Sequence, residues 1–225
     1  MLLISIFAGM FGEIFVLSKL VVPGDANTTT ANIRASEFLY RLGFAGYLVE
    51  AVCDVALILL FYLLLKPVNK NHASFTVLLG LVSMITFAFT ELFYIAVPLI
   101  LHSDFLKTLS ADQINSQAML SIRLYGYGNG VFMLFYGLAT GVRGYLITRS
   151  GFLPAWLGII LMTGGACFVI RNFLMVLSPA AASDLLLLPT GIGMIVLALW
   201  LLIKGITRSS STSPGNAPRA PQTPA

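Results

Sequence analysis

Charged side chains are scarce in this chain of 225 residues. Only 10% of the residues are charged, whereas 58% are hydrophobic. A soluble domain averages about 25% charged residues. This chain has less than half of that share, which is too few charged side chains to cover a globular surface in water. The scarcity excludes an ordinary soluble enzyme and a nucleic-acid-binding protein. The net charge of +4 is typical of a membrane protein with basic cytoplasmic loops.

Cysteine and histidine are also rare, with two residues of each. Two cysteines exclude a disulfide framework and a cysteine-rich zinc site. His72 and His102 are expected on opposite sides of the membrane, so they cannot jointly hold a metal or a haem. No zinc-protease, nucleophile-elbow, P-loop or dinucleotide motif occurs in the sequence. We therefore expect no cofactor and no metal site.

Long hydrophobic runs are what the sequence has instead. A helix needs about 20 apolar residues to cross the hydrocarbon of a bilayer, and proline or glycine separates most of the runs that reach this length. The sequence predicts an all-α, polytopic membrane helical bundle over residues 1–206, and no strand alternation indicates a β-barrel. The six predicted spans are 2–22, 42–65, 75–101, 119–142, 152–177 and 185–206.

Lysine and arginine in the short loops predict the orientation of these six transmembrane helices. One side carries seven basic residues and the other carries three, which makes the first side cytoplasmic and places both termini there. The segment 207–225 is rich in serine, proline and threonine, and we expect a disordered cytoplasmic tail. The first span has no basic residue before it and no A-x-A site before Pro23, so we expect it to be retained. The seven basic residues are Lys66, Lys70, Arg143, Arg149, Lys204, Arg208 and Arg219, and the three are Arg34, Arg41 and Lys107.

Several polar side chains stand at membrane depth, where one charge costs at least about 2.5–3.5 kcal/mol. Glu50 and Asp54 are four residues apart and share a helix face, so at least one of them is expected to be protonated or paired. Arg171 is the basic group that the sequence places deep enough to pair with them. We therefore expect an acidic cluster around Arg171, facing the bundle interior. The candidate ligand- or proton-binding residues are Glu13, Glu50, Asp54, Glu91, Arg171 and Asn172.

The residues leave two roles open for this cluster. In the first, a buried ion pair and neutral acids hold the helices in register. In the second, the cluster lines a polar cavity open to the outside, which carries protons or binds a cationic or hydrogen-bonding ligand.

Glycines form a narrow stripe on the fourth predicted span. Gly126, Gly130, Gly137 and Gly141 fall within about 60° of one another on a helix. A stripe of small residues favours close helix packing, within one chain or between two. The alternative role is a hinge or a backbone-lined pocket, together with the neighbouring Tyr125, Tyr127 and Asn129.

A set of loop motifs resembles a known family. The motifs are VVPGDA at 21–26, ASE at 35–37, YRLG at 40–43, LLKPVN at 64–69, GYLI at 144–147, RSGFLP at 149–154 and LWLLIKG at 199–205. Together they resemble the prokaryotic membrane-protein family catalogued as domain of unknown function 4386, over nearly the whole chain before the tail. The resemblance implies a multi-helix integral membrane protein, mostly bacterial, and therefore a multi-pass protein of the bacterial cytoplasmic membrane. It implies no established activity.

Two functions remain from different classes. The favoured one is a non-catalytic membrane module or partner subunit, because the loops are short, no motif is present and the glycine stripe suits packing. The alternative is a small transporter or ligand-binding membrane protein with an outward-facing acidic polar cavity. An enzyme is the least favoured, because no nucleophile, metal set or base has a fitting spacing. The expected partners are the lipid bilayer and a second copy or another membrane protein, without nucleic acid, and the small-molecule ligand is unknown.

Overall fold

The computed structural model describes residues 1–106 and 108–211, and every regular element in these ranges is a helix. The first membrane-length segment joins α1 (Leu2–Met10), the π-helix η1 (Phe11–Leu17) and α2 (Ser18–Leu20). A short helix, α3 (Ala26–Ala35), follows. The long helices are α4 (Glu37–Leu65), α5 (Lys70–Leu101), α6 (Ala111–Arg149), α7 (Ala155–Leu177) and α8 (Leu188–Ser211). The short 3-10 helices are η2 (Asp104–Leu106), η3 (Pro179–Ala181) and η4 (Asp184–Leu187).

Six segments of the described residues are long and apolar enough to cross a membrane, which confirms the predicted all-α architecture and indicates a multi-pass membrane protein. Several helices run past the predicted spans. The 39 residues of α6 extend about 58 Å at about 1.5 Å per residue, nearly twice the roughly 30 Å of hydrocarbon in a bilayer. The six segments are Leu2–Leu20, Glu37–Leu65, Lys70–Leu101, Ala111–Arg149, Ala155–Leu177 and Asp184–Lys204.

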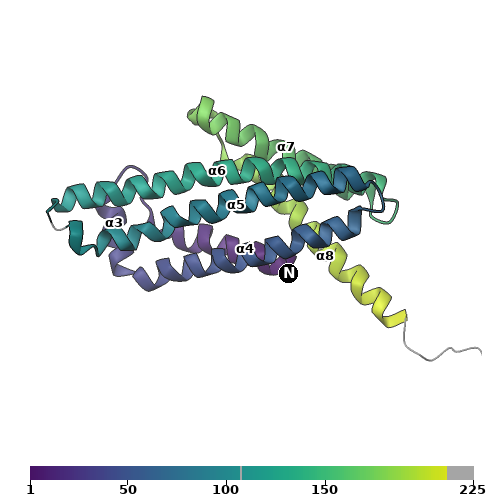
Figure 1. The fold of residues 1–225 in the computed structure, drawn as a ribbon, viewed down its shortest axis with the longest axis horizontal. Helices are drawn as coiled ribbons and strands as arrows, with labels where there is room; N and C mark the ends of the chain where they lie inside the picture. The colour runs from purple at the N-terminus through teal and green to yellow at the C-terminus, as the bar shows by residue number, and fades with distance from the viewer. Residues whose placement is uncertain (107, 212–225) are drawn as a thin grey trace, which may run out of the picture.

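Helices α5 and α6 lie side by side along the long axis of the molecule, and α4 packs against α5 (Figure 1). The short helix α3 lies at one end of this group, which we call the α3 end. Helix α7 packs along α6 and then diverges from it, and α8 returns at an angle across the bundle (Figure 1). The divergence of α7 opens space between helices that are elsewhere in close contact.

Helix α8 extends into the segment that the sequence predicted to be a disordered tail. The helix continues to Ser211, so the first residues of the segment 207–225 are helical. Residues 212–225, with Arg219, lie outside the described part of the chain, and so does Lys107.

An aromatic pair joins α4 to α5 in the core near the α3 end. The rings of Tyr40 and Tyr94 stack with centroids 4.2 Å apart. The hydroxyl of Tyr40 donates to the carbonyl of Tyr94 at 3.0 Å, and the hydroxyl of Tyr94 donates to the carbonyl of Tyr40 at 2.9 Å. Pro98 lies four residues after Tyr94 and has no N–H. The tyrosine hydroxyl therefore supplies the hydrogen bond that the helix itself cannot give to this carbonyl.

Glycines bring α6 and α7 into backbone contact. A Cβ on Gly137 would lie 2.9 Å from the carbonyl oxygen of Gly165, and a Cβ on Gly144 would lie 2.6 Å from that of Gly158. Gly130 packs against the side chain of Met175. The stripe on α6 thus faces α7 within one chain at these positions, as small residues at membrane helix contacts do. Gly126 and Gly141 have open space at their Cβ positions instead.

The two classes of glycine on this stripe give a matched test. We expect Gly137→Ala to lower the free energy of unfolding by about 1–3 kcal/mol, because the added methyl group overpacks the contact with α7. Gly141→Ala meets nothing within 4 Å and should raise stability by about 0.5–1 kcal/mol, because alanine favours a helix over glycine. Thermal unfolding of both variants in detergent checks this. Equal melting temperatures would contradict the assigned contact.

Candidate functional site

A cavity of about 540 Å³ lies where α7 diverges from α6, and we call it the arginine cavity. Its wall comes from the first membrane-length segment, α6, α7 and η4. Two arginines and two carboxylates stand on this wall, so its formal charges balance. The lining residues are Glu13, Arg123, Tyr125, Gly126, Tyr127, Asn129, Met133, Arg171, Met175, Asp184 and Leu187.

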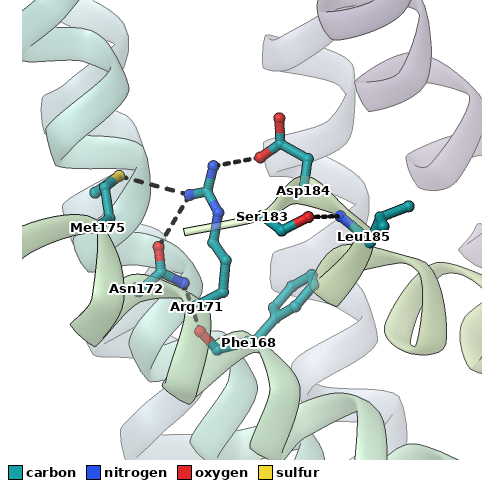
Figure 2. Close-up of polar contacts among 7 residues, drawn as sticks. All are labelled: Phe168, Arg171, Asn172, Met175, Ser183, Asp184 and Leu185. Carbon is teal, nitrogen blue, oxygen red and sulfur yellow. Dashed lines mark hydrogen bonds and ion pairs between the residues drawn. The ribbon is translucent and has the colours of Figure 1, made fainter. Parts of the chain in front are cut away.

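Arg171 is held in place by contacts from α7 and η4, as Figure 2 shows. Its Nη2 donates to Oδ1 of Asp184 at 2.7 Å, and its Nη1 donates to Oδ1 of Asn172 at 3.3 Å and contacts Sδ of Met175 at 3.5 Å. Asn172 is itself fixed, because its Nδ2 donates to the carbonyl of Phe168 at 2.7 Å. The Nε of Arg171 is buried without a partner among the described residues. The Nε–H of the guanidinium is thus an unused donor.

Glu13 enters the same cavity from the π-helix η1. The hydroxyl of Tyr47 on α4 donates to its Oε2 at 3.1 Å. Segments of π-helix are rare and occur often at functional sites. The cavity therefore presents one carboxylate from η1 opposite the arginines of α6 and α7.

A second cavity, of about 240 Å³, holds Glu50 and Asp54 on its wall, and we call it the carboxylate cavity. The hydroxyl of Ser5 donates to Oδ1 of Asp54 at 2.5 Å. The carboxyl of Glu50 rests on Gly9 of α1, where a Cβ would lie 2.6 Å from its Oε2. Most of the other lining side chains are apolar, so these two acids are its charged groups.

Arg143 lies beyond Asp54, and the sequence did not predict this position. The loop count placed Arg143 on the cytoplasmic surface, but it is 5% exposed and its guanidinium lies 5.0 Å from the centre of the Phe61 ring. The reason is that α6 continues without a break to Arg149. The sequence did contain a signal for this longer helix, because neither a proline nor a turn motif stands between Arg143 and Ser150. Arg143 and Asp54 line one small cavity of about 10 Å³, which we call the Arg143 niche.

The predicted cluster around Arg171 is wrong in its pairing. Among the described residues, no hydrogen bond or ion pair joins Arg171 to Glu50, Asp54 or Glu91, and its acidic partner is Asp184. The physical reason is that the diverging end of α7 carries Arg171 toward η4. Arg171 is also not the one basic group placed to pair with these acids, because Arg143 is more buried and lines a cavity with Asp54.

Glu91 lies apart from both cavities. It is 3% exposed, and neither of its carboxyl oxygens has a hydrogen-bond partner in the described part of the chain. The acids nevertheless remain electrostatic neighbours, since Glu50 lies within range of Glu13, Asp54 and Glu91. Within residues 1–106 and 108–211, no three metal-ligating side chains form a group that could hold an ion.

Glu91 yields a stability prediction. A buried acceptor without a partner costs about 1–3 kcal/mol, so Glu91→Met should raise the free energy of unfolding by a similar amount. Methionine fits because it is unbranched and adapts to irregular space. Glu37→Met is the control, since Glu37 pairs with Arg41 at a partly exposed site and should change stability by less than about 1 kcal/mol. A lower melting temperature for Glu91→Met in detergent would refute this prediction.

Comparison with known proteins agrees with the loop motifs. An uncharacterized protein of Archaeoglobus fulgidus is 26% identical to the chain over 161 residues, which cover 71% of the chain and 82% of that protein. No solved structure matches the chain. The family described as "Domain of unknown function (DUF4386)" matches residues 1–205, a range that includes both cavities. The chain belongs to this family.

Proposed function

We propose that the protein is a multi-pass protein of the bacterial cytoplasmic membrane that binds a small polar solute in the arginine cavity, as a small transporter or ligand-binding protein does. The observation that carries the proposal is the cavity itself, with Arg123, Arg171 and Glu13 on its wall. Ligand sites are typically concave, of about 300–1,000 Å³, with a few converging polar groups. The cavity raises ligand binding above the non-catalytic module that the sequence favours.

The free groups on the wall set the chemistry of the solute. Arg123 is exposed and has no hydrogen bond or ion pair with the described residues. The Nε of Arg171 is an unused donor, and Oδ1 of Asn129 is an unused acceptor. Guanidinium groups bind carboxylate and phosphate most strongly. We therefore propose a solute with an anionic group and a hydrogen-bond donor, in place of the cationic ligand of an acidic cavity.

The proposed orientation of the helices determines the side of the membrane to which the arginine cavity opens. The excess of lysine and arginine at the opposite end of the bundle favours a cytoplasmic location for that end. Arg123 is about 39 Å from Arg149 along α6, at about 1.5 Å per residue. Arg123 then stands near the outer surface of the bilayer, and we propose that both termini are cytoplasmic.

Thermal unfolding tests the proposed function. We expect one or more members of a panel of amino acids, hydroxy acids and sugar phosphates to raise the melting temperature of the detergent-solubilised protein. A ligand at about 100 times its Kd adds about 2.7 kcal/mol to the native state. Arg123→Gln should lose this shift, because it removes the unpaired guanidinium.

Arg34→Gln is the matched control, because Arg34 is an exposed arginine of α3 that does not line the cavity, and it should keep the shift. A panel without effect on the wild-type protein, or an equal effect on Arg123→Gln, would overturn the proposal.

A partner-subunit role is the second candidate. The observation that favours it is an apolar groove of about 600 Å³ on the outer face of α4 and α5, whose lining includes Val52, Leu59 and Val77. Such a surface suits another membrane helix. Native mass spectrometry that shows a stable dimer, together with no solute shift, would favour this role.

A further inference from the structure

Three cavities follow one another between the helices. The arginine cavity and the carboxylate cavity share Met133 and Leu187 on their walls. The carboxylate cavity and the Arg143 niche in turn share Leu2, Asp54 and Tyr136. Cavities with common walls are neighbours in space, so these form one row that begins at the arginine cavity.

Carboxyl groups stand along this row at decreasing distance from the end opposite to α3. Glu13 belongs to the first cavity, whereas Glu50 and Asp54 belong to the second. At about 1.5 Å per residue, Glu50 is about 22 Å and Asp54 about 16 Å from Leu65 at the end of α4. The row therefore leads from the arginine cavity into the middle of the membrane-length helices.

Each carboxyl group has identified electrostatic neighbours. Glu13 faces Tyr47, Asp184 and Arg171, and Glu50 faces Glu13, Asp54 and Glu91. Asp54 faces Ser5 and Arg143, while Tyr136 of α6 lies near Glu50, Asp54 and Arg143. Arg171 is paired with Asp184, and Arg123 shares the wall of the arginine cavity with Glu13. Arg143 is the cation beside Asp54, in the Arg143 niche.

One cation cannot balance Glu50, Asp54 and Glu91 together. Burial of an unpaired charge is expensive, and a carboxyl group avoids this cost when it takes up a proton. The acids of the row therefore need protons in order to be stable where they are. The arginine cavity is the opening through which water can deliver those protons.

The surroundings of Arg143 are a second, independent observation that bears on the far end of this row of cavities. It is 5% exposed, it lines the niche with Asp54, and its Nε has no hydrogen-bond partner among the described residues. The niche has about the space of one water molecule. A buried guanidinium repels an approaching proton, as arginines do in pores that exclude protons.

We propose that Glu50 and Asp54 form a proton-binding site that is filled from the arginine cavity through Glu13, and that Arg143 is the barrier at its far end. A hydronium ion in the water of the arginine cavity gives its proton to the carboxylate of Glu13 and becomes a water molecule. The proton then passes to the carboxylate of Glu50 or Asp54, which becomes a neutral acid while Glu13 regains its charge. No oxidant or reductant takes part. The site goes beyond solute binding and does not depend on the identity of the solute.

Infrared spectroscopy of the protein in lipid vesicles tests the site directly. We expect a C=O stretching band of a protonated carboxyl group at neutral pH, and a shift of part of this band after transfer to D2O. The double variant Glu50→Gln with Asp54→Asn should lose the part of the band that shifts in D2O and keep the part that Glu91 contributes, whereas Glu37→Gln should keep the whole band. A band of which no part shifts in D2O, or whose shifting part persists in the double variant, would overturn the proposal.

A thiol probe tests the passage in case the double variant fails to fold. Met133→Cys places a thiol where the first two cavities meet, in a chain with Cys53→Ala and Cys167→Ala. We expect it to react with a membrane-impermeant methanethiosulfonate reagent. Ile85→Cys, at a 70% exposed site on an apolar face of α5, should not react in vesicles. An unreactive Met133→Cys would overturn the passage.

The barrier has a separate readout. In vesicles with a pH gradient and an internal pH-sensitive dye, Arg143→Gln should speed the collapse of the gradient, and Arg34→Gln should not. An unchanged rate would overturn the role of Arg143. None of these measurements uses a solute, so the two proposals can fail separately. If no solute raises the melting temperature but the carboxyl band still shifts in D2O, solute binding is rejected and the proton-binding site is retained.

Discussion

Hydrocarbon offers no hydrogen-bond partner, so a polar group in a membrane-length helix must find one within the protein. The chain largely obeys this constraint. Ser83 donates to the carbonyl of Phe132, and Ser121 donates to the carbonyl of Phe93, which joins α5 to α6. Among the described residues, the exceptions include the hydroxyls of Thr140 and Thr190 and also several ionisable groups, above all Glu91 with its two unpartnered oxygens. The retention of these ionisable groups against a cost in stability is typical of residues kept for function.

The position of the cavities depends on how α6 and α7 contact each other. Glycine lets the two backbones touch at Gly137 with Gly165 and at Gly144 with Gly158. Larger side chains follow along α7, and toward its C-terminal end the helix diverges from α6 (Figure 1), where both helices contribute to the wall of the arginine cavity. Close packing and an open polar space therefore occupy successive parts of the same helix pair. The first holds the bundle together, and the second exposes the charged groups.

The sequence predicted the membrane-length helices well, because each rests on a local run of apolar residues with a required length. It failed at pairings between helices. Arg143 was assigned to a loop because a positive charge near a span end normally marks the surface, yet α6 continues past it. The partner of Arg171 was missed as well, since Asp184 pairs with it from the 3-10 helix η4. Such contacts depend on helix tilt and rotation, which no local pattern encodes.

The proline in α5 has a consequence that reaches another helix. Pro98 deprives a carbonyl of its donor, and Tyr40 of α4 is the residue that compensates. The two positions are thus linked by compensation although they lie on different helices. Tyr40→Phe alone would leave the carbonyl of Tyr94 without a donor in an apolar environment. After Pro98→Ala, the N–H of residue 98 could donate to that carbonyl, and the same change at Tyr40 would not leave it unpaired. Loss of the Tyr40 hydroxyl would therefore leave stability unchanged only in a chain in which Pro98 had already been replaced.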